Sequence, residues 1–423
     1  MISPRILLIA VSLLCVGLSA EPESPKSHSS VNTIKHLSYG DEILFSSRIL
    51  SREIPINIYL PQTFHQASKQ HRYPVIFING THGKEFFHAL TGAVKHLSSV
   101  ERMPESIVIS LNDGGDEPET YLHGMWTHTT EEKFSAQGDP EAYSKFLTEE
   151  LFPYLESNYR ALNNRMIIGV STSSIFPLYA LTNKPGLFQS YFFLSAADIF
   201  GMGPTSESTF IDEITTSMQT SSNKISAFYF AMADSDMRKD KRYDKILSQI
   251  NTKLSPYVKE NLKLKIEVLN NENHYGAFIK AALTAIELNY PHEEWSANYR
   301  ELISQPGDAL QNIDHFYQSL SQKYGFPILS RATRWRNVNK LSHITKLLLK
   351  DGRIQEAINV ARRWVEYRPN SIDAHQSLAQ ALQQNDEISE ASDVLKKALE
   401  ISRNQDKSKT AAINRQIAEL KLN

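Results

Sequence analysis

The 423-residue sequence contains a single cysteine, Cys15, so no disulfide bond can form within the chain. Its formal net charge is only -2, from 45 basic and 47 acidic residues, and it has no cluster of basic residues. Surfaces that bind nucleic acid or an anionic membrane need such a cluster, so the composition disfavours both classes of protein. A chain of this length can instead bury a sizeable apolar core, divided among two or three domains.

Residues 1–20 have the pattern of a secretory signal peptide. A short basic start is followed by an apolar run over residues 7–18 and by small residues up to Ala20. The apolar run is too short to span a membrane, and cleavage after Ser19 or Ala20 would remove it together with Cys15. The sequence therefore predicts a periplasmic or secreted protein whose mature form has no cysteine and must be stabilised by its core.

Short apolar runs alternate with helical periods up to about residue 290. The first two strands suggest a hairpin, and the later ones read as buried strands that end at turns. The expected strands are residues 42–50, 54–60, 74–79, 106–111, 166–170, 191–195, 225–232 and 264–269. The main expected helices are residues 84–97, 141–159 and 242–251, with further helices after residues 174 and 275. This alternation predicts a mostly parallel sheet with helices on both faces.

Beyond about Pro291 the sequence predicts only helices. Residues 349–357 recur loosely as residues 383–391, an offset of 34 residues. A helix-turn-helix period of this length is typical of tetratricopeptide repeats, and a plain helical hairpin bundle is the alternative. Two repeats cannot bury a solenoid core alone, so we expect them to pack on the upstream helices or on the catalytic domain.

Residues 165–174 place a serine where a buried strand breaks into an apolar helix. The core Gly169-x-Ser171-x-Ser173 follows the nucleophile-elbow pattern except at its last position, where glycine is usual. Such a turn lifts the serine Oγ clear of the sheet. It also directs the backbone N–H of Thr172 toward a developing oxyanion.

Ser171, then Asp234 or Asp236, then His274 follow the serine, acid, histidine order of α/β-hydrolases. Each lies at or just past the C-terminal end of an expected strand, where open α/β sheets bind their ligands. The serine would attack a carbonyl, the histidine would carry the proton, and the carboxylate would orient the imidazole. Asp198 is a third candidate acid. Alternatively, Asp234 and Asp236 are a helix N-cap and a solvated acid.

A second oxyanion donor is expected in the turn after residues 74–79, with Thr81 as the candidate. Four other histidines show no spacing typical of a metal site: His82, His88, His123 and His128. Because side chains and backbone N–H groups would supply all of the expected chemistry, we predict neither a metal ion nor another cofactor.

The sequence around these residues resembles the putative esterase family of α/β-hydrolases, which includes enterochelin-type siderophore esterases and S-formylglutathione hydrolases. The C-terminal part is similar to the tetratricopeptide extension of some bacterial members. The resemblance implies Ser171 as nucleophile, His274 as base, and Asp236 as acid because it best fits the family's pattern after that strand. The matching stretches are residues 73–80, 103–109, 150–160, 165–171, 185–188 and 272–274.

The chain departs from the family pattern at two adjacent positions of the elbow, Ser173 and Ser174, where the family usually has two glycines. Asn79 likewise replaces the family's usual aspartate before Gly80. A Cβ in the elbow crowds the close approach of helix and strand. These departures bear on substrate class and rate more than on the fold.

The predicted fold is an α/β-hydrolase domain followed by an all-α tetratricopeptide-like domain. The predicted function is an exported serine esterase that hydrolyses a carboxylic ester through an acyl-enzyme, such as a siderophore-type or acyl-sugar ester. The alternative is a catalytically weak or inactive hydrolase scaffold whose repeats bind a protein partner. The expected regions are 1–20 signal peptide, 21–34 disordered leader, 35–292 esterase domain, 293–336 helical linker and 337–423 repeats.

Overall fold

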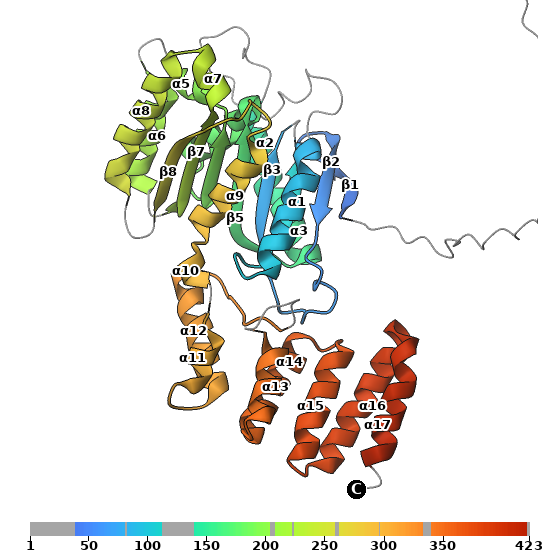
Figure 1. Ribbon diagram of the computed structural model, residues 1–423. Helices are drawn as coiled ribbons and strands as arrows, with labels where there is room; N and C mark the ends of the chain where they lie inside the picture. The colour runs from blue at the N-terminus through green and yellow to red at the C-terminus, as the bar shows by residue number, and fades with distance from the viewer. Residues whose placement is uncertain are drawn as a thin grey trace, which may run out of the picture. The chain divides into compact units, whose positions relative to one another are not determined.

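A mixed sheet forms the centre of the N-terminal half of the chain (Figure 1). The computed structural model describes residues 39–80, 83–111, 139–203, 208–221, 224–258, 262–295, 297–332 and 340–420. Among them are eight strands: β1 (Asp41–Ser47), β2 (Arg52–Tyr59), β3 (Tyr73–Asn79), β4 (Ile107–Leu111), β5 (Ala161–Val170), β6 (Ser190–Leu194), β7 (Ala227–Ala233) and β8 (Lys263–Leu269). The predicted signal peptide and the predicted disordered leader over residues 21–34 lie outside the described residues.

The strands lie side by side in the order β1-β2-β4-β3-β5-β6-β7-β8. β1 and β2 form the predicted antiparallel hairpin, and β2 also pairs antiparallel with β4. Every other pairing is parallel. The expectation of a mostly parallel sheet is therefore confirmed, and the carboxyl ends of β3 to β8 meet at one edge.

Alternating side chains divide the core of the sheet into two apolar layers, because successive residues of a strand face opposite sides. On β3, Val75 and Phe77 belong to one layer, and Ile76 and Ile78 belong to the other. Helices on both faces complete these layers, as parallel strands require. The first face carries α2 (Pro140–Lys145), η3 (Phe146–Leu151), α3 (Phe152–Tyr159), α4 (Ile175–Asn183), α5 (Ala197–Gly201), α6 (Phe210–Ser221) and α8 (Arg242–Leu254), and the second carries α1 (Gly83–Ser99) and α9 (Phe278–Asn289).

The predicted helix over residues 141–159 is present but is not uniform. Its middle part, η3, is a π-helix, and the amide of Phe152 donates to the carbonyl of Leu147, five residues back. Pro153 lies in the first turn of α3, where its missing N–H does least harm. The two short helices α5 and α6 were not predicted from the sequence.

Paired helices make up the C-terminal part of the described chain. α14 begins at Ile354 and α16 at Ile388, which preserves the predicted offset of 34 residues. Gly352 and Asp386 precede them with φ values of 73° and 60°, so both turns are left-handed. The helices are α10 (His292–Trp295), α11 (Tyr299–Ser304), α12 (Ala309–Tyr324), α13 (Leu341–Lys350), α14 (Ile354–Tyr367), α15 (Ile372–Gln384), α16 (Ile388–Gln405) and α17 (Thr410–Leu420).

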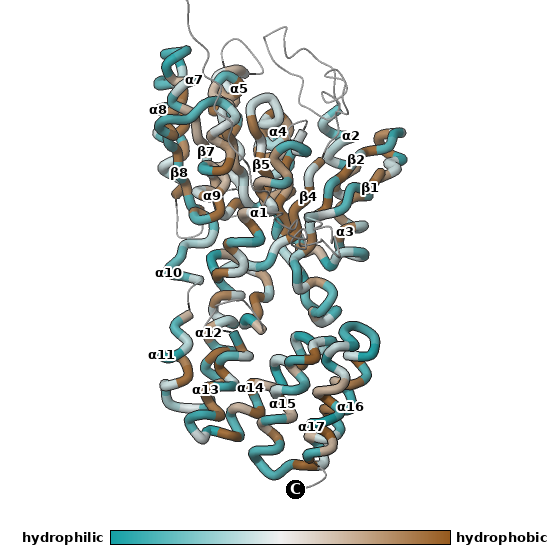
Figure 2. Tube along the Cα trace, turned by 45° about the vertical axis from the view of Figure 1, so that its right-hand side comes forward, coloured by the Kyte–Doolittle hydropathy of each residue, from teal (hydrophilic) through white to brown (hydrophobic). Residues whose placement is uncertain are grey.

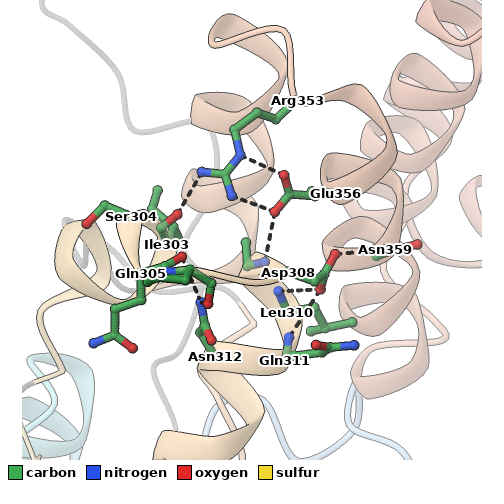
Figure 3. A network of polar contacts seen from close by, with 12 residues as sticks. Ile303, Ser304, Gln305, Asp308, Leu310, Gln311, Asn312, Arg353, Glu356 and Asn359 are labelled. Atoms are coloured by element: carbon green, nitrogen blue, oxygen red, sulfur yellow. Dashed lines mark hydrogen bonds and ion pairs between the residues drawn. The ribbon is translucent and has the colours of Figure 1, made fainter.

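Polar contacts attach the first repeat to the helices that precede it (Figure 3). The Arg353 guanidinium donates to the carbonyl of Ile303 at 2.7 Å and to the carboxylate of Glu356 at 2.7 and 2.5 Å. Glu356 in turn accepts from the amide of Ala309 at 2.8 Å, at the N-terminus of α12, where a negative charge is favourable. The repeats thus pack on upstream helices, as expected.

Hydropathy follows this division into layers. Figure 2 shows hydrophobic residues concentrated along the strands of the sheet, whereas the helices alternate hydrophobic and hydrophilic residues along their length. That alternation is typical of helices with one buried face. In the part of the chain that the structure describes, we find no helix with the length and hydrophobicity needed to cross a bilayer.

A buried carboxylate joins the repeats to the sheet domain. Glu105 is only 3% exposed and accepts a hydrogen bond from Thr63 Oγ1 at 2.5 Å. The guanidinium of Arg368, at the end of α14, donates to Glu105 Oε2 at 3.3 Å, and Arg331 Nη1 lies 3.8 Å from the same oxygen. The amide of Ser68 also donates to the carbonyl of Tyr367 at 3.1 Å. These contacts hold the end of α14 against the loops around β3.

His71 lies beside this charge cluster and is neutral at pH 7. Burial lowers the pKa of His71 to about 4, the charge of Glu105 opposes this shift, and Arg368 and Arg331 reinforce it. The unfolded chain would bind the same proton near pH 6.5, at about the ordinary value. The unfolded state therefore holds more protons between these values, and stability falls as the pH is lowered from about 6.5 to about 4.

Replacement of Arg368 by alanine should lower the free energy of unfolding by about 3 kcal/mol, because it removes the guanidinium that donates to the buried carboxylate of Glu105. Denaturant unfolding of the full chain measures this. The matched control is Arg362→Ala, which removes an arginine of the same helix whose 2.9 Å pair with Glu390 lies at the surface. The control should lose less than about 1 kcal/mol. Equal losses in both variants would contradict the role given to the buried cluster.

Candidate functional site

Polar residues follow four adjacent parallel strands at the carboxyl edge of the sheet. Register places Val170 of β5 beside Leu194 of β6, and Leu194 beside Ala231 of β7. Ala233 of β7 in turn lies beside Leu269 of β8. The segments that begin at residues 171, 195, 234 and 270 therefore leave the sheet at the same edge, although the first and the last are 99 positions apart in the chain.

Ser171 is the first residue after β5 and has a strained backbone. Its φ is 51°, whereas Val170 before it is extended. A left-handed conformation costs a residue with a Cβ about 1–2 kcal/mol. The chain then continues through the 3-10 turn η4 (Ser171–Ser174) into α4. This strand, strained serine and helix make the local geometry expected of a nucleophile elbow.

Two glycines make room for the two serines that replace glycine in the elbow. An added Cβ on Gly169 would lie 2.6 Å from the Cα of Ser174, and one on Gly80, where φ is 77°, would lie 2.5 Å from Ser173 Oγ. Both serines are buried. The crowding expected from Ser173 is therefore relieved by Gly80 at the end of the neighbouring strand β3.

Asn79 ties the end of β3 to the same turn. Its side-chain Nδ2 donates to the carbonyl of Ser173 at 2.9 Å, and the amide of Gly83 donates to the carbonyl of Gly80 at 2.8 Å. The turn from β3 into α1 is thus attached to the elbow, which is where the second oxyanion donor was expected. Thr81 itself lies outside the described residues. Thr172 is the second residue of η4, and its carbonyl accepts from the amide of Ile175.

Asp236 and His274 form a hydrogen-bonded pair. Oδ2 of Asp236 lies 2.8 Å from Nδ1 of His274. The carboxylate is 6% exposed and the imidazole 31%, so the acid lies beneath the ring. A carboxylate at Nδ1 holds the proton on that nitrogen and leaves Nε2 available to accept another. Lys239 Nζ also donates to Asp236 at 3.2 Å.

The other two candidate acids have different partners. Asp234 accepts from the amide of Glu272 at 3.0 Å and forms an ion pair with Arg238. Hydrogen bonds from these groups, with Arg238 contributing most, lower the pKa of Asp234. Asp198 lies in the first turn of α5 and accepts from the amide of Ile199 at 3.0 Å. Asp234 therefore fastens the loop that carries His274, whereas Asp236 contacts the imidazole.

Ser195 was not singled out by the sequence. It follows β6 with a φ of 54°, and its Oγ donates to the carbonyl of His274 at 3.0 Å. A serine that follows an apolar run is not a pattern from which such a contact can be predicted. Among the described residues, no group of three or more His, Cys, Asp or Glu side chains could hold a metal ion.

Comparison with known families matches both halves of the chain. The family described as Putative esterase matches residues 47–264, just over half of the chain. A tetratricopeptide repeat family matches residues 348–412, which confirms the repeat interpretation over the plain hairpin bundle. No curated protein matches the sequence.

Two solved structures share the fold, and a third has a lower TM-score. An IroE-like serine hydrolase from Shewanella oneidensis is 16% identical, with a TM-score of 0.57 over 75% of this chain and 95% of that one. An uncharacterised protein from Capnocytophaga ochracea is 14% identical, with a TM-score of 0.51 over 91% of this chain and 100% of that one. The siderophore hydrolase EstB from Aspergillus nidulans is 13% identical, covering 63% and 99%, with a TM-score of 0.48. At such identities these likenesses concern the fold alone.

The close packing at the elbow predicts a large difference between two glycine substitutions. Gly169→Ala should lower the free energy of unfolding by about 3 kcal/mol, because its Cβ would strike backbone in the turn. Gly92→Ala is the control, since Gly92 lies within α1 and an added Cβ there meets nothing within 4 Å. It should be neutral or stabilise the protein by about 0.5–1 kcal/mol. Denaturant unfolding that ranks the two variants alike would contradict this account.

Proposed function

The chain belongs to the family described as Putative esterase, and on that premise we propose that it is an exported serine esterase that hydrolyses a carboxylic ester through an acyl-enzyme. The observation that carries the proposal is the 2.8 Å pair between Asp236 and His274 at the edge where the strained Ser171 leaves β5. A buried acid, a half-exposed imidazole and an elbow serine are the three groups that acyl transfer to a serine requires.

In the proposed reaction, Ser171 Oγ attacks the ester carbonyl while Nε2 of His274 takes its proton. Asp236 keeps the other imidazole proton on Nδ1 and stabilises the imidazolium. The N–H groups of Thr172 and Thr81 are assigned to the oxyanion. Collapse of the tetrahedral intermediate transfers the proton to the departing alcohol and leaves an acyl ester on Ser171. Water then attacks this ester, with His274 again as base, and releases the acid.

The proposed substrate class is a siderophore-type or an acyl-sugar ester. Support for the first comes from the family resemblance of the sequence around the three catalytic residues. The proposed reaction needs no metal ion or cofactor, since side chains supply the nucleophile and the base, and backbone N–H groups supply the oxyanion donors. The proposed location is the periplasm or the outside of the cell, on the strength of the signal-peptide pattern in residues 1–20.

A protein-binding role for the repeats is a second candidate, favoured by a groove of about 970 Å³. Residues of α13, α15 and α17 line it, together with residues of the loop after β2. Most lining side chains are neutral and polar, and Gln376 and Gln416 are joined across it by a 2.8 Å hydrogen bond. Such a surface suits an uncharged polypeptide segment, whose backbone amides it could bind.

Labelling with a fluorophosphonate tests the esterase proposal directly. The wild type should become covalently labelled and should hydrolyse short p-nitrophenyl esters, whereas Ser171→Ala should do neither. Intact-protein mass spectrometry measures the label, and circular dichroism checks that both proteins are folded. A folded wild type that takes no label and cleaves no ester would overturn the proposal in favour of the binding role.

The acid assignment predicts unequal effects of two neighbouring substitutions. Asp236→Asn should lower kcat by about 10⁴-fold, because the amide favours the wrong imidazole tautomer. Asp234→Asn should lower kcat by less than about tenfold, since Asp234 contacts the loop backbone and not the ring. Steady-state kinetics on one p-nitrophenyl ester compares the two variants. The reverse ranking would transfer the role to Asp234.

A further inference from the structure

Ser195 stands at the position of β6 that corresponds to Ser171 on β5. Register pairs Val170 with Leu194, and each serine is the next residue of its strand. Both have left-handed backbones, with φ values of 51° and 54°. For Ser171 the strained turn has a chemical reason, which is exposure of the nucleophile. Ser195 is instead 2% exposed, so its strain needs another explanation.

The hydrogen bonds of Ser195 supply that explanation. Its amide donates to the carbonyl of Ala231 at 2.9 Å and so continues the ladder between β6 and β7 by one residue. Its Oγ donates to the carbonyl of His274 at 3.0 Å, although His274 follows β8, two strands away in the sheet. The loop after β8 therefore reaches back across the end of β7 to the end of β6.

This contact decides where the imidazole is held relative to the nucleophile. β6 is the neighbour of β5, and adjacent strands lie about 4.8 Å apart. Attachment at Ser195 thus ties the backbone of His274 to β6, the strand beside the one that ends just before Ser171. Asp236 holds the ring of the same residue through Nδ1 at 2.8 Å. Backbone and ring are fixed from two different strands.

The neighbouring contacts of the loop do not replace this one. Asp234 Oδ1 accepts from the amide of Glu272 at 3.0 Å, and Asn273 Oδ1 accepts from the amide of Gly276 at 2.7 Å. The first holds the loop two residues before His274, over the end of β7, and the second lies within the loop. The bond from Ser195 is made at His274 itself and comes from the strand beside the elbow.

We propose that Ser195 is a positioning residue, which uses its strained backbone and its buried hydroxyl to hold His274 at the distance that activates Ser171. This inference rests on the proposed esterase function. A residue with a Cβ remains left-handed only where its surroundings impose that conformation. Here the backbone hydrogen bond to Ala231 and the side-chain hydrogen bond to His274 impose this conformation together, because Ser195 must make both.

Two variants separate the hydroxyl from the strain. Ser195→Ala removes the hydrogen bond and keeps the strained Cβ, whereas Ser195→Gly removes the bond and also relieves the strain. The matched control is Ser190→Ala on the same strand. Ser190 is equally buried, at 2% exposed, and its Oγ donates to Asn289 Oδ1 at 2.9 Å, but at the opposite end of β6.

Both Ser195 variants should lower kcat on a p-nitrophenyl ester about tenfold and leave KM within twofold of the wild type. The rate of fluorophosphonate labelling should fall in parallel, since it depends on the same base. Ser195→Gly should keep the melting temperature of the wild type or exceed it, so that lost stability cannot account for the lost rate. Ser190→Ala should leave kcat and KM within twofold.

Two outcomes would overturn the inference: kcat within twofold of the wild type in both Ser195 variants, or a wild-type kcat in Ser195→Gly alone. A wild type that takes no label would instead count against the esterase proposal. In that case the imidazole NMR signal of His274 still tests Ser195. The Nδ1 proton shared with Asp236 should be protected from exchange in the wild type and in Ser190→Ala, and should exchange faster in both Ser195 variants. Unchanged exchange would again overturn the inference.

Discussion

The candidate site depends on how closely the turn after β5 approaches the backbones of β3 and β5. Gly169 and Gly80 lack the side chains that would occupy this space, and Ser173 and Ser174 fill it instead. The turn is therefore held from both strands, with Asn79 bound to its backbone. A close fit of this kind maintains the strained φ of Ser171, because relaxation of that residue would move the whole turn.

Three groups at the same edge hold His274 and the loop that carries it. Asp236 orients an imidazole, Asp234 fastens the loop that carries it, and Ser195 holds the backbone of His274 from a third position. Parallel strands favour this arrangement of side chains, because their carboxyl ends already lie side by side. The contacts of Asp234 and Asp236 also explain why two aspartates two residues apart have different roles. One lies beneath the ring, and the other bonds to the main chain.

Sequence patterns predicted that serine, acid and histidine follow strands of the sheet in this order, and they predicted the turn at Ser171 and the helical period. Each of these patterns is recognised from residues that are close in the chain. They also favoured Asp236 over Asp234, through the spacing of the family motif. They missed Ser195, whose role depends on a register between strands and on a left-handed φ that no residue type specifies. The compensation of Ser173 by Gly80 was missed for the same reason, since the two lie on different strands. The short helices α5 and α6 were missed as well.

The buried cluster around Glu105 has a consequence for the order of events during synthesis. Thr63 and Glu105 leave the ribosome early, whereas Arg368, which donates to the carboxylate of Glu105, follows 263 residues later. Until then the buried carboxylate lacks this charged hydrogen bond, which disfavours closure of the core around it. The end of α14 is thus made long after the loops around β3, and yet it completes the packing of those loops. The sheet domain therefore gains this part of its stability only after the first repeat has been made.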